Sequence, residues 1–258
     1  MNTRLPTLPT RRLALSAVGL LTLLLLWAAG IALMGQDQGM ARLFSPALAL
    51  SSLSELILGN ELTVHTLVSL QRVAVGLFWA LLFGVPIGLA IGASRKLELA
   101  TSGAFQFLRM ISPLSWMPIA VMLFGIGDAP IYFLLSFAAV WPIILNTSAG
   151  VRQLDKRWLM LAHSLSATRS EILWRIVLPG SMGHILTGVR LAIGIVWIIL
   201  VPCEMLGVSS GLGYFILDTR DRLAYSELMA VILLIGALGF LLDTIAQRLH
   251  RRWARGRA

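Results

Sequence analysis

Apolar runs of roughly 20 residues recur along this chain, and they constrain its fold more than any other feature. A helix needs about 20 consecutive apolar residues to cross the hydrocarbon core of a bilayer, and several runs reach this length. Hydrophobic residues make up 57% of the 258 residues, charged residues make up 13%, and the mean hydropathy is +0.84. These values exclude a soluble globular protein. We therefore predict an all-α, polytopic membrane protein.

Six transmembrane helices can be placed on the apolar runs. Their approximate ranges are Leu13–Met34, Leu70–Gly92, Phe105–Phe124, Pro130–Gly150, Ile185–Leu206 and Leu228–Leu249. Pro142 inside the fourth predicts a kink, because proline removes one hydrogen bond of the helix. Arg11 and Arg12 precede the first span, as arginines precede the apolar core of an export signal. However, this apolar run is longer than the roughly 7–15 residues of a signal-peptide core. We therefore expect an uncleaved first span.

Lys and Arg are distributed unevenly between the connections. If both ends of the chain are inside, fifteen of the 21 Lys and Arg fall in inner segments, whereas the outer loops hold only Arg42, Arg220 and Arg222. Cytoplasmic loops of membrane proteins carry such an excess of basic residues. We therefore predict that both termini are cytoplasmic.

The spans divide the chain into a cytoplasmic segment 1–12, a transmembrane domain 13–249 and a basic cytoplasmic tail 250–258. The first outer connection, about 35–69, is long enough for a short helix on the membrane surface. A tight outer turn is expected at Gly125–Ala129. The largest inner connection, about 151–184, is amphipathic, and we call it the inner loop.

The first half of the inner loop has the pattern of a short helix. Asp155 is a plausible N-cap residue. Trp158, Leu161, Ala162 and Leu165 follow at helical spacing and form one apolar face.

The second half predicts another helix after a turn at Ser166-Ala167. Thr168 and Glu171 match the capping box, in which each side chain bonds the other residue's backbone N–H, so the helix should begin at Arg169. It should end near Leu178-Pro179. Two readings stay open on these residues alone: a helix pair lying against lipid headgroups, or a helix pair that docks into a groove of a soluble partner.

The stretch from Met160 to Pro179 resembles the cytoplasmic EAA loop of ABC importer permeases. Ala162 stands at the last alanine of that motif, Ala167 follows its glycine position, and Leu178-Pro179 match its ending. The resemblance implies that the loop forms coupling helices in a cleft of an ATPase subunit. The residues it assigns to this contact are Trp158, Met160, Leu161, Ala162, Leu165, Ser166, Ala167 and Pro179.

Two residues depart from the family motif. Met160 stands where the family has glutamate, and Ser166 stands where it has glycine. Glycine adopts a positive φ at little cost, whereas serine needs a negative-φ turn or accepts strain of roughly 1 kcal/mol or more.

Other stretches are similar to the permeases of the nitrate, sulfonate, taurine, bicarbonate and cyanate importers, over about Leu67–Ile245. They are Ser69–Val73, Ser112–Pro118, Trp141–Thr147, Leu186–Ala192 and Glu204–Leu206. The resemblance implies a bacterial inner-membrane permease for a small anionic solute. Its implied partners are a second permease copy, two cytoplasmic ATPase subunits and a periplasmic or lipid-anchored solute-binding protein, with membrane lipids around it.

The sequence predicts transport without catalysis in this chain. No phosphate-binding loop surrounds Lys96 or Lys156, so ATP and magnesium are expected on the partner ATPase and no cofactor on this chain. The single cysteine, Cys203, excludes an intramolecular disulfide, and the four histidines lack metal-ligand spacing. The basic residues behind the net charge of +9 lie beside the apolar runs, and this distribution argues against nucleic-acid binding. The alternative is a self-sufficient secondary transporter of a small anion, although no inverted repeat is visible.

Ionisable residues within spans are costly and usually face a protein interior or a water-filled cavity. Arg72, predicted near the outer end of the second span, is the residue we expect to attract an anion. Arg109 and Arg190 are expected toward the inner ends of their spans, as anchors or interhelical hydrogen-bond donors. Glu204 should pair with an arginine or shape a gate. Trp116, between two prolines, should break the third span and line the path. The candidate path or gate residues are Arg72, Trp116, Arg190 and Glu204.

Overall fold

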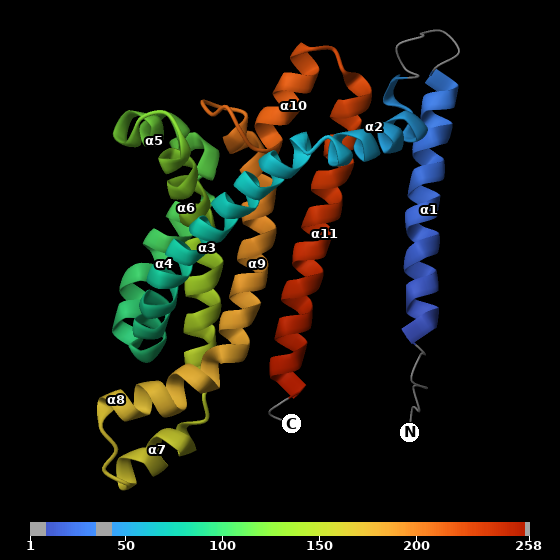
Figure 1. The fold of residues 1–258 in the computed structure, drawn as a ribbon. Helices are drawn as coiled ribbons and strands as arrows, with labels where there is room; N and C mark the ends of the chain where they lie inside the picture. Colours follow the sequence, from blue (N-terminus) through green and yellow to red (C-terminus); the bar gives the residue numbers. More distant parts are fainter. Residues whose placement is uncertain (1–8, 35–42, 256–258) are drawn as a thin grey trace. The chain divides into compact units, whose positions relative to one another are not determined.

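The computed structural model describes residues 9–34 and 43–255, and these residues form helices and no strands (Figure 1). The described residues fall into two compact units, one within Met1–Glu61 and Asp218–Leu234 and the other within Leu62–Leu217 and Ile235–Ala258. The predicted fold class, an all-α protein, is therefore confirmed for this part of the chain. The terminal residues 1–8 and 256–258, together with 35–42 of the predicted outer connection, lie outside the described residues.

The first unit contains α1 (Pro9–Met34) and α2 (Pro46–Leu58). The predicted span Leu13–Met34 lies within α1, and α2 is the short helix expected in the first outer connection. Ser45 caps α2 by accepting a hydrogen bond from Leu48 N, and Pro46 occupies its first turn, where no N–H partner is needed. The Phe44 and Tyr225 rings pack 5.0 Å apart within this unit.

The second unit is built around α6 (Asp128–Arg152), which packs along α9 (Leu178–Glu204) and α3 (Glu61–Ala93) (Figure 1). Glycine brings these backbones close together. A Cβ atom on Gly88 of α3 would lie 2.6 Å from the Thr147 Cβ, and one on Gly188 of α9 would lie 3.0 Å from the Pro142 carbonyl oxygen. Small residues at helix interfaces permit this close packing in membrane proteins.

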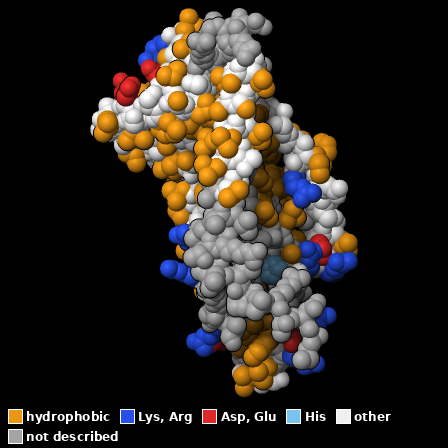
Figure 2. Space-filling view, turned by 90° about the vertical axis from the view of Figure 1, so that its right-hand side faces the viewer, with side chains coloured by type: hydrophobic (Ala, Val, Ile, Leu, Met, Phe, Trp, Pro, Cys, Tyr) orange, Lys and Arg blue, Asp and Glu red, His pale blue; other side chains and the backbone are white. Residues whose placement is uncertain are grey.

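Four helices are long and apolar enough to cross a membrane: α3, α6, the continuous helical stretch Arg169–Glu204, and Tyr225–Trp253 within α11 (Tyr225–Arg255). A fifth candidate is the bent pair described next, and α1 contributes the shorter apolar stretch Leu21–Leu33. Hydrophobic side chains cover much of the face seen in Figure 2, as contact with lipid requires. The described residues thus provide four or five candidate spans, and the predicted count of six is not confirmed.

The predicted third span, Phe105–Phe124, is not one helix. The chain forms α4 (Arg95–Met110), a short 3₁₀ turn at Pro113–Trp116 and α5 (Met117–Phe124), and the two halves are bent by 85° (Figure 1). Pro113 has no N–H and disfavours a helical conformation at the residue before it, so α4 ends ahead of it. The break near Trp116 that the sequence predicted is therefore present.

The remaining connections of the second unit are short. The turn predicted at Gly125–Ala129 is present, with positive φ at Gly125 and Gly127, and α6 begins within it at Asp128. The helix α6 continues through Pro142, whose carbonyl accepts a hydrogen bond of 2.8 Å from Asn146 Nδ2. Gly211, with a φ of 113°, turns the chain into α10 (Leu212–Asp221).

Candidate functional site

The inner loop begins with the exposed helix α7 (Lys156–Ser164). Asp155 caps it as predicted, because its carboxylate accepts a hydrogen bond of 2.9 Å from Arg157 N. Ala162 is only 6% exposed and turns inward, whereas Trp158 is 61% exposed and Leu165 is 73% exposed. Apolar side chains on one short helix are thus left without cover in the described structure. Met160 and Leu161 are exposed as well.

The sequence left two conformations open for Ser166, a negative-φ turn or a strained positive φ, and the structure has the second. Ser166 has a φ of 56°, in the left-handed region where glycine is favoured. The turn closes through Ser166 N to His163 O and Ala167 N to Ala162 O, each 3.0 Å. Ser166 therefore turns the chain as glycine would at this position, but at a cost in backbone energy.

The capping box after the turn is confirmed. Glu171 N donates to Thr168 Oγ1 at 3.3 Å, and Thr168 N donates to Glu171 Oε2 at 2.8 Å. Helix α8 (Arg169–Ile172) starts at the predicted residue.

The predicted end at Leu178-Pro179 is wrong. A π-helical turn, Leu173–Val177, connects α8 directly to α9, and Pro179 lies in the first turn of α9. Pro179 cannot donate to the carbonyl four residues back and its ring crowds that position. The wider π turn lets the helix pass this point, and the chain changes direction there (Figure 1).

A groove of 1260 Å³ lies beside the helix pair within the second unit. Its apolar lining comes from the end of α3, including Leu89, from Leu154 and Leu159, and from Trp174. Basic side chains of Arg95, Lys156 and Arg169 also line it. The inner loop thus presents an apolar surface with a basic border.

The sequence predicted that Arg72 attracts an anion, but in the structure its side chain is paired with carboxylates. Its side chain is 2% exposed, and Nη1 donates to Glu204 Oε1 at 2.8 Å and to the Ser210 carbonyl at 2.7 Å. Nε and Nη2 donate to one oxygen of Asp128 at 2.9 and 2.6 Å. The predicted pairing of Glu204 with an arginine is confirmed. These partners join α3, the start of α6 and the end of α9, and we call them the Arg72 cluster.

Polar groups around Glu204 extend this cluster. Ser69 Oγ donates to the carboxylate at 2.7 Å and accepts a hydrogen bond from Leu212 N, while Gly213 N donates to the other oxygen. Gly211 N donates to His65 Nδ1 at 3.0 Å. The sequence pointed to Arg72 and Glu204 but missed Ser69, His65 and Asp128. The spacing of Ser69 and Arg72, one helical turn apart, was the available signal.

Arg190 is an interhelical hydrogen-bond donor, one of the two roles expected for it. It pairs with Asp243 of α11 at 2.9 Å, and both side chains are partly exposed. Thr187 and His250 approach to 3.2 Å between the same helices, and Trp197 Nε1 donates to the Ile235 carbonyl. These contacts attach the second half of α11 to α9.

Arg109 lies in the last turn of α4 rather than at the beginning of a span, because α4 begins well before the predicted start. Its side chain is exposed and makes no ion pair or hydrogen bond with the described residues. Trp116 is half-buried, with its ring 5.5 Å from that of Phe137, and its Nε1 has no hydrogen-bond partner among the described residues.

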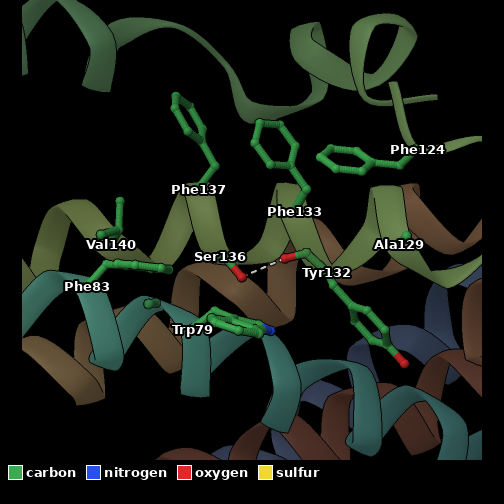
Figure 3. A pocket seen from close by; sticks show the side chains of 10 residues that line it. Trp79, Phe83, Phe124, Ala129, Tyr132, Phe133, Ser136, Phe137 and Val140 are labelled. Carbon is green, nitrogen blue, oxygen red and sulfur yellow. Dashed lines mark hydrogen bonds between the residues drawn. The ribbon is translucent and has the colours of Figure 1, made fainter. Parts of the chain in front are cut away.

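A separate apolar cavity of 480 Å³ lies between α3, α5 and α6 (Figure 3). Phe124, Phe133 and Phe137 lie side by side along one flank, with successive ring centroids 5.4 and 6.1 Å apart, while Trp79 and Phe83 belong to α3. The lining carries no charged residue. This cavity therefore suits apolar groups rather than a small anion. Among the described residues, no group of three or more His, Cys, Asp and Glu side chains could hold a metal ion.

Comparison of the sequence with protein families finds one match. Residues 80–255 match the binding-protein-dependent transport system inner membrane component. The chain is 38% identical to the bicarbonate transport system permease protein CmpB of Synechococcus elongatus over 72% of this chain and 68% of that protein. It is 34% identical to the taurine transport system permease protein TauC of Escherichia coli, over 73% and 68%. It is 36% identical to the nitrate import permease protein NrtB of Leptolyngbya laminosa, over 69% and 63%.

Solved structures share the fold. An inward-facing MetNI methionine ABC transporter chain matches with a TM-score of 0.60 at 18% identity, covering 72% of this chain and 92% of that one. A chain of an amino acid ABC transporter with histidines matches with a TM-score of 0.57 at 17% identity, covering 79% and 97%.

Proposed function

Since the chain belongs to the binding-protein-dependent transport system inner membrane components, the permeases of ABC importers, we propose that it forms the translocation pathway of an ATP-driven importer for a small anionic solute. The relatives named above are permeases for bicarbonate, taurine and nitrate. These solutes share a small size and an anionic carboxylate-like, sulfonate or nitrate group. The proposed cargo is a solute of this class, with cyanate and organosulfonates included.

The exposed apolar face of α7 is the observation that carries the coupling part of this proposal. Trp158, Leu161 and Leu165 are too exposed to be core residues of the described structure, and Leu159 and His163 of the same helix line the 1260 Å³ groove. Exposed apolar patches of this kind mark contact surfaces. We propose that Trp158, Met160, Leu161, Ala162, Leu165, Ser166, Ala167 and Pro179 form or position the contact with an ATPase subunit.

The proposed assembly follows from the same premise. Two copies of the permease enclose the pathway, two cytoplasmic ATPase subunits bind the inner loops, and a solute-binding protein delivers cargo on the other side. Residues 13–249 form the six-span permease domain, and the two basic ends of the chain lie in the cytoplasm of a bacterial cell. ATP and magnesium bind the partner ATPase, and this chain supplies the route and the gate rather than catalysis.

Reconstituted transport tests the proposal. The permease is placed in proteoliposomes with the ATPase and the binding protein of its own transport system, and uptake of labelled bicarbonate, nitrate and taurine is measured with ATP on the ATPase side. ATP-dependent uptake of one of these solutes is expected. Uptake by the permease alone, without the ATPase, would establish a secondary transporter and overturn the proposal.

A further inference from the structure

The 1260 Å³ groove beside the inner loop is larger than a small anion needs, because small-molecule sites in proteins occupy roughly 300–1,000 Å³. Its apolar wall comes from the last turns of α3, from α7 and from the π turn, and it includes Val85, Leu89, Leu154, Leu159, Trp174 and Val177. The helix α3 is one of the candidate spans. The wall is therefore continuous with a surface that suits the interior of a bilayer.

Helix α7 turns toward this groove a different face from the one proposed for the ATPase. Lys156, Leu159 and His163 line the groove, and their spacing of three and four residues places them on one side of the helix. Trp158 and Leu165, seven residues apart, share another side and do not belong to the lining. A partner bound to Trp158 and Leu165 thus leaves the groove to another occupant.

Cations outnumber carboxylates around the groove. Glu98 is the one acidic residue of the described lining, and it is paired with both Arg95 and Arg152. Lys156 and Arg169 also line the groove, and neither pairs with a carboxylate of the described residues. The lining therefore has a positive charge that its own side chains do not neutralise.

The positions of three of these cations are unfavourable for the helices that hold them. Arg95 is the first residue of α4, Lys156 is the first of α7, and Arg169 is the first of the helical stretch Arg169–Glu204. The helix dipole disfavours positive charge at this end. Helix stability therefore does not account for the three cations, whereas an anion held between them would offset the repulsion.

We propose that the groove is a binding site for one anionic phospholipid, of the phosphatidylglycerol class. Its acyl chains lie against the apolar wall, and its phosphate lies among Arg95, Lys156 and Arg169. Long apolar chains account for the size and lining of the groove, which a free inorganic anion would not need. Basic pockets between helices on the cytoplasmic side of a membrane bind anionic lipid headgroups in this way. The inference goes beyond the proposed function and does not depend on which solute is carried.

Lipid binding to the full-length permease tests the site. Delipidated permease in a neutral detergent is titrated with phosphatidylglycerol or with phosphatidylcholine of the same acyl chains, and native mass spectrometry counts the lipids bound to each chain. Saturable binding of one phosphatidylglycerol is expected, with an affinity about tenfold or more above that of phosphatidylcholine. Sodium phosphate, compared with sodium chloride at matched ionic strength, should not displace it.

Matched double variants locate the headgroup. Lys156→Gln with Arg169→Gln is expected to weaken phosphatidylglycerol binding about tenfold or more and to leave phosphatidylcholine binding unchanged. Arg157→Gln with Arg175→Gln removes the same charge from the inner loop, but neither residue lines the groove, so affinity should not change. All four side chains are exposed, so the variants should fold.

A second pair of variants tests the acyl-chain part of the site. Ala90→Trp adds a large side chain to the wall of the groove and keeps every charge, so it should also weaken phosphatidylglycerol binding. Ala100→Trp places the same side chain on an exposed position of α4 outside the lining, and binding should remain as in the wild type.

Four outcomes overturn the inference. Equal affinities for the two lipids, or equal losses in the two double variants, would show binding without a defined headgroup site. Displacement by sodium phosphate would make the groove a site for a free anion, and displacement by the ATPase subunit would make it part of the ATPase contact. The binding is measured without ATP or solute. Failure of ATP-driven uptake would therefore reject the proposed function and leave the lipid site standing.

Discussion

Arg72 is a cation whose hydrogen-bonding capacity is met inside the protein. Its partners, Asp128, Glu204 and the Ser210 carbonyl, come from segments far apart in the chain. Removing one member of a buried ion pair leaves an uncompensated charge, whereas replacing both members by apolar residues is far less costly. Loss of one member of the cluster is therefore expected to destabilise the packing of α3, α6 and α9 more than loss of one member of an exposed pair.

Arg72→Met is expected to destabilise the permease by about 3–5 kcal/mol, because it leaves Glu204 buried without its cation. The double variant Arg72→Met with Glu204→Met should recover much of this loss, which thermal unfolding in nanodiscs measures. Arg220→Gln breaks an exposed pair with Asp221 and should cost less than about 1 kcal/mol. Equal stability of the single and double variants would show that the pair carries no such coupling.

Ser166 is a second residue whose energetics follow from its conformation. Because Ser166 has a φ of 56°, Ser166→Gly is expected to relieve strain of about 1 kcal/mol and to raise the unfolding midpoint or leave it unchanged. Ser164→Gly, two residues earlier at the end of α7, should lower stability by up to about 1 kcal/mol, since glycine is unfavourable in a helix. The reverse order of the two variants would contradict the assigned turn.

At the scale of elements, the helix pair of the inner loop follows local rules that a sequence displays. The Asp155 cap, the Thr168–Glu171 capping box and the turn at Ser166 each depend on residues within four positions of one another. These features were predictable for that reason. The continuation of the helix past Pro179 was not, because it depends on a π turn that shifts the hydrogen-bond register without a sequence signal of its own.

Leu165→Asp is expected to abolish ATP-driven uptake while the protein still inserts into the membrane. The side chain is exposed, so a carboxylate there costs the fold little, but it would meet the apolar contact proposed for the ATPase. Uptake and co-purification of the ATPase are measured together. Leu165→Met keeps the apolar surface and should retain both. Normal transport by Leu165→Asp would remove α7 from the proposed contact.

The approach of α3 to α6 gives a packing prediction. Gly88→Val should strongly reduce the yield of folded protein, because its Cβ would lie 2.6 Å from the Thr147 Cβ and 2.8 Å from the Ile144 carbonyl oxygen. Gly103→Val, in α4, has nothing within 4 Å of its added Cβ and serves as the control. Monodispersity after purification reports the difference. Equal yields would mean that the helices separate without loss.

At the scale of the whole molecule, the sequence predicted the class of the protein and most of its helices. The apolar runs, the broken third span and the short α2 were visible in residue type and spacing. The partners of Arg72 and Arg190 were not, because each depends on which distant helices lie together. Periodicity describes one helix at a time, and it says nothing about the residue that another helix supplies.

The proposed sidedness can be measured because Cys203, the single cysteine, is buried. Ser164→Cys in the inner loop should react with a membrane-impermeant maleimide only from the cytoplasmic side, and Ser209→Cys, after α9, only from the opposite side. Both positions are exposed, and the unmodified protein should give little background. Labelling of both positions from one side would contradict the proposed topology.

The unbroken helical path from Arg169 to Glu204 has a mechanical consequence. It begins beside the proposed ATPase contact and ends at the carboxylate that holds Arg72, with a π turn near its beginning. No loop interrupts it, so a displacement at the proposed contact cannot be absorbed by uncoiled chain. Such a displacement must either bend the π turn or be transmitted along the helix to the ion pair at its far end. The stiffness of Leu173–Val177 therefore decides between these two responses.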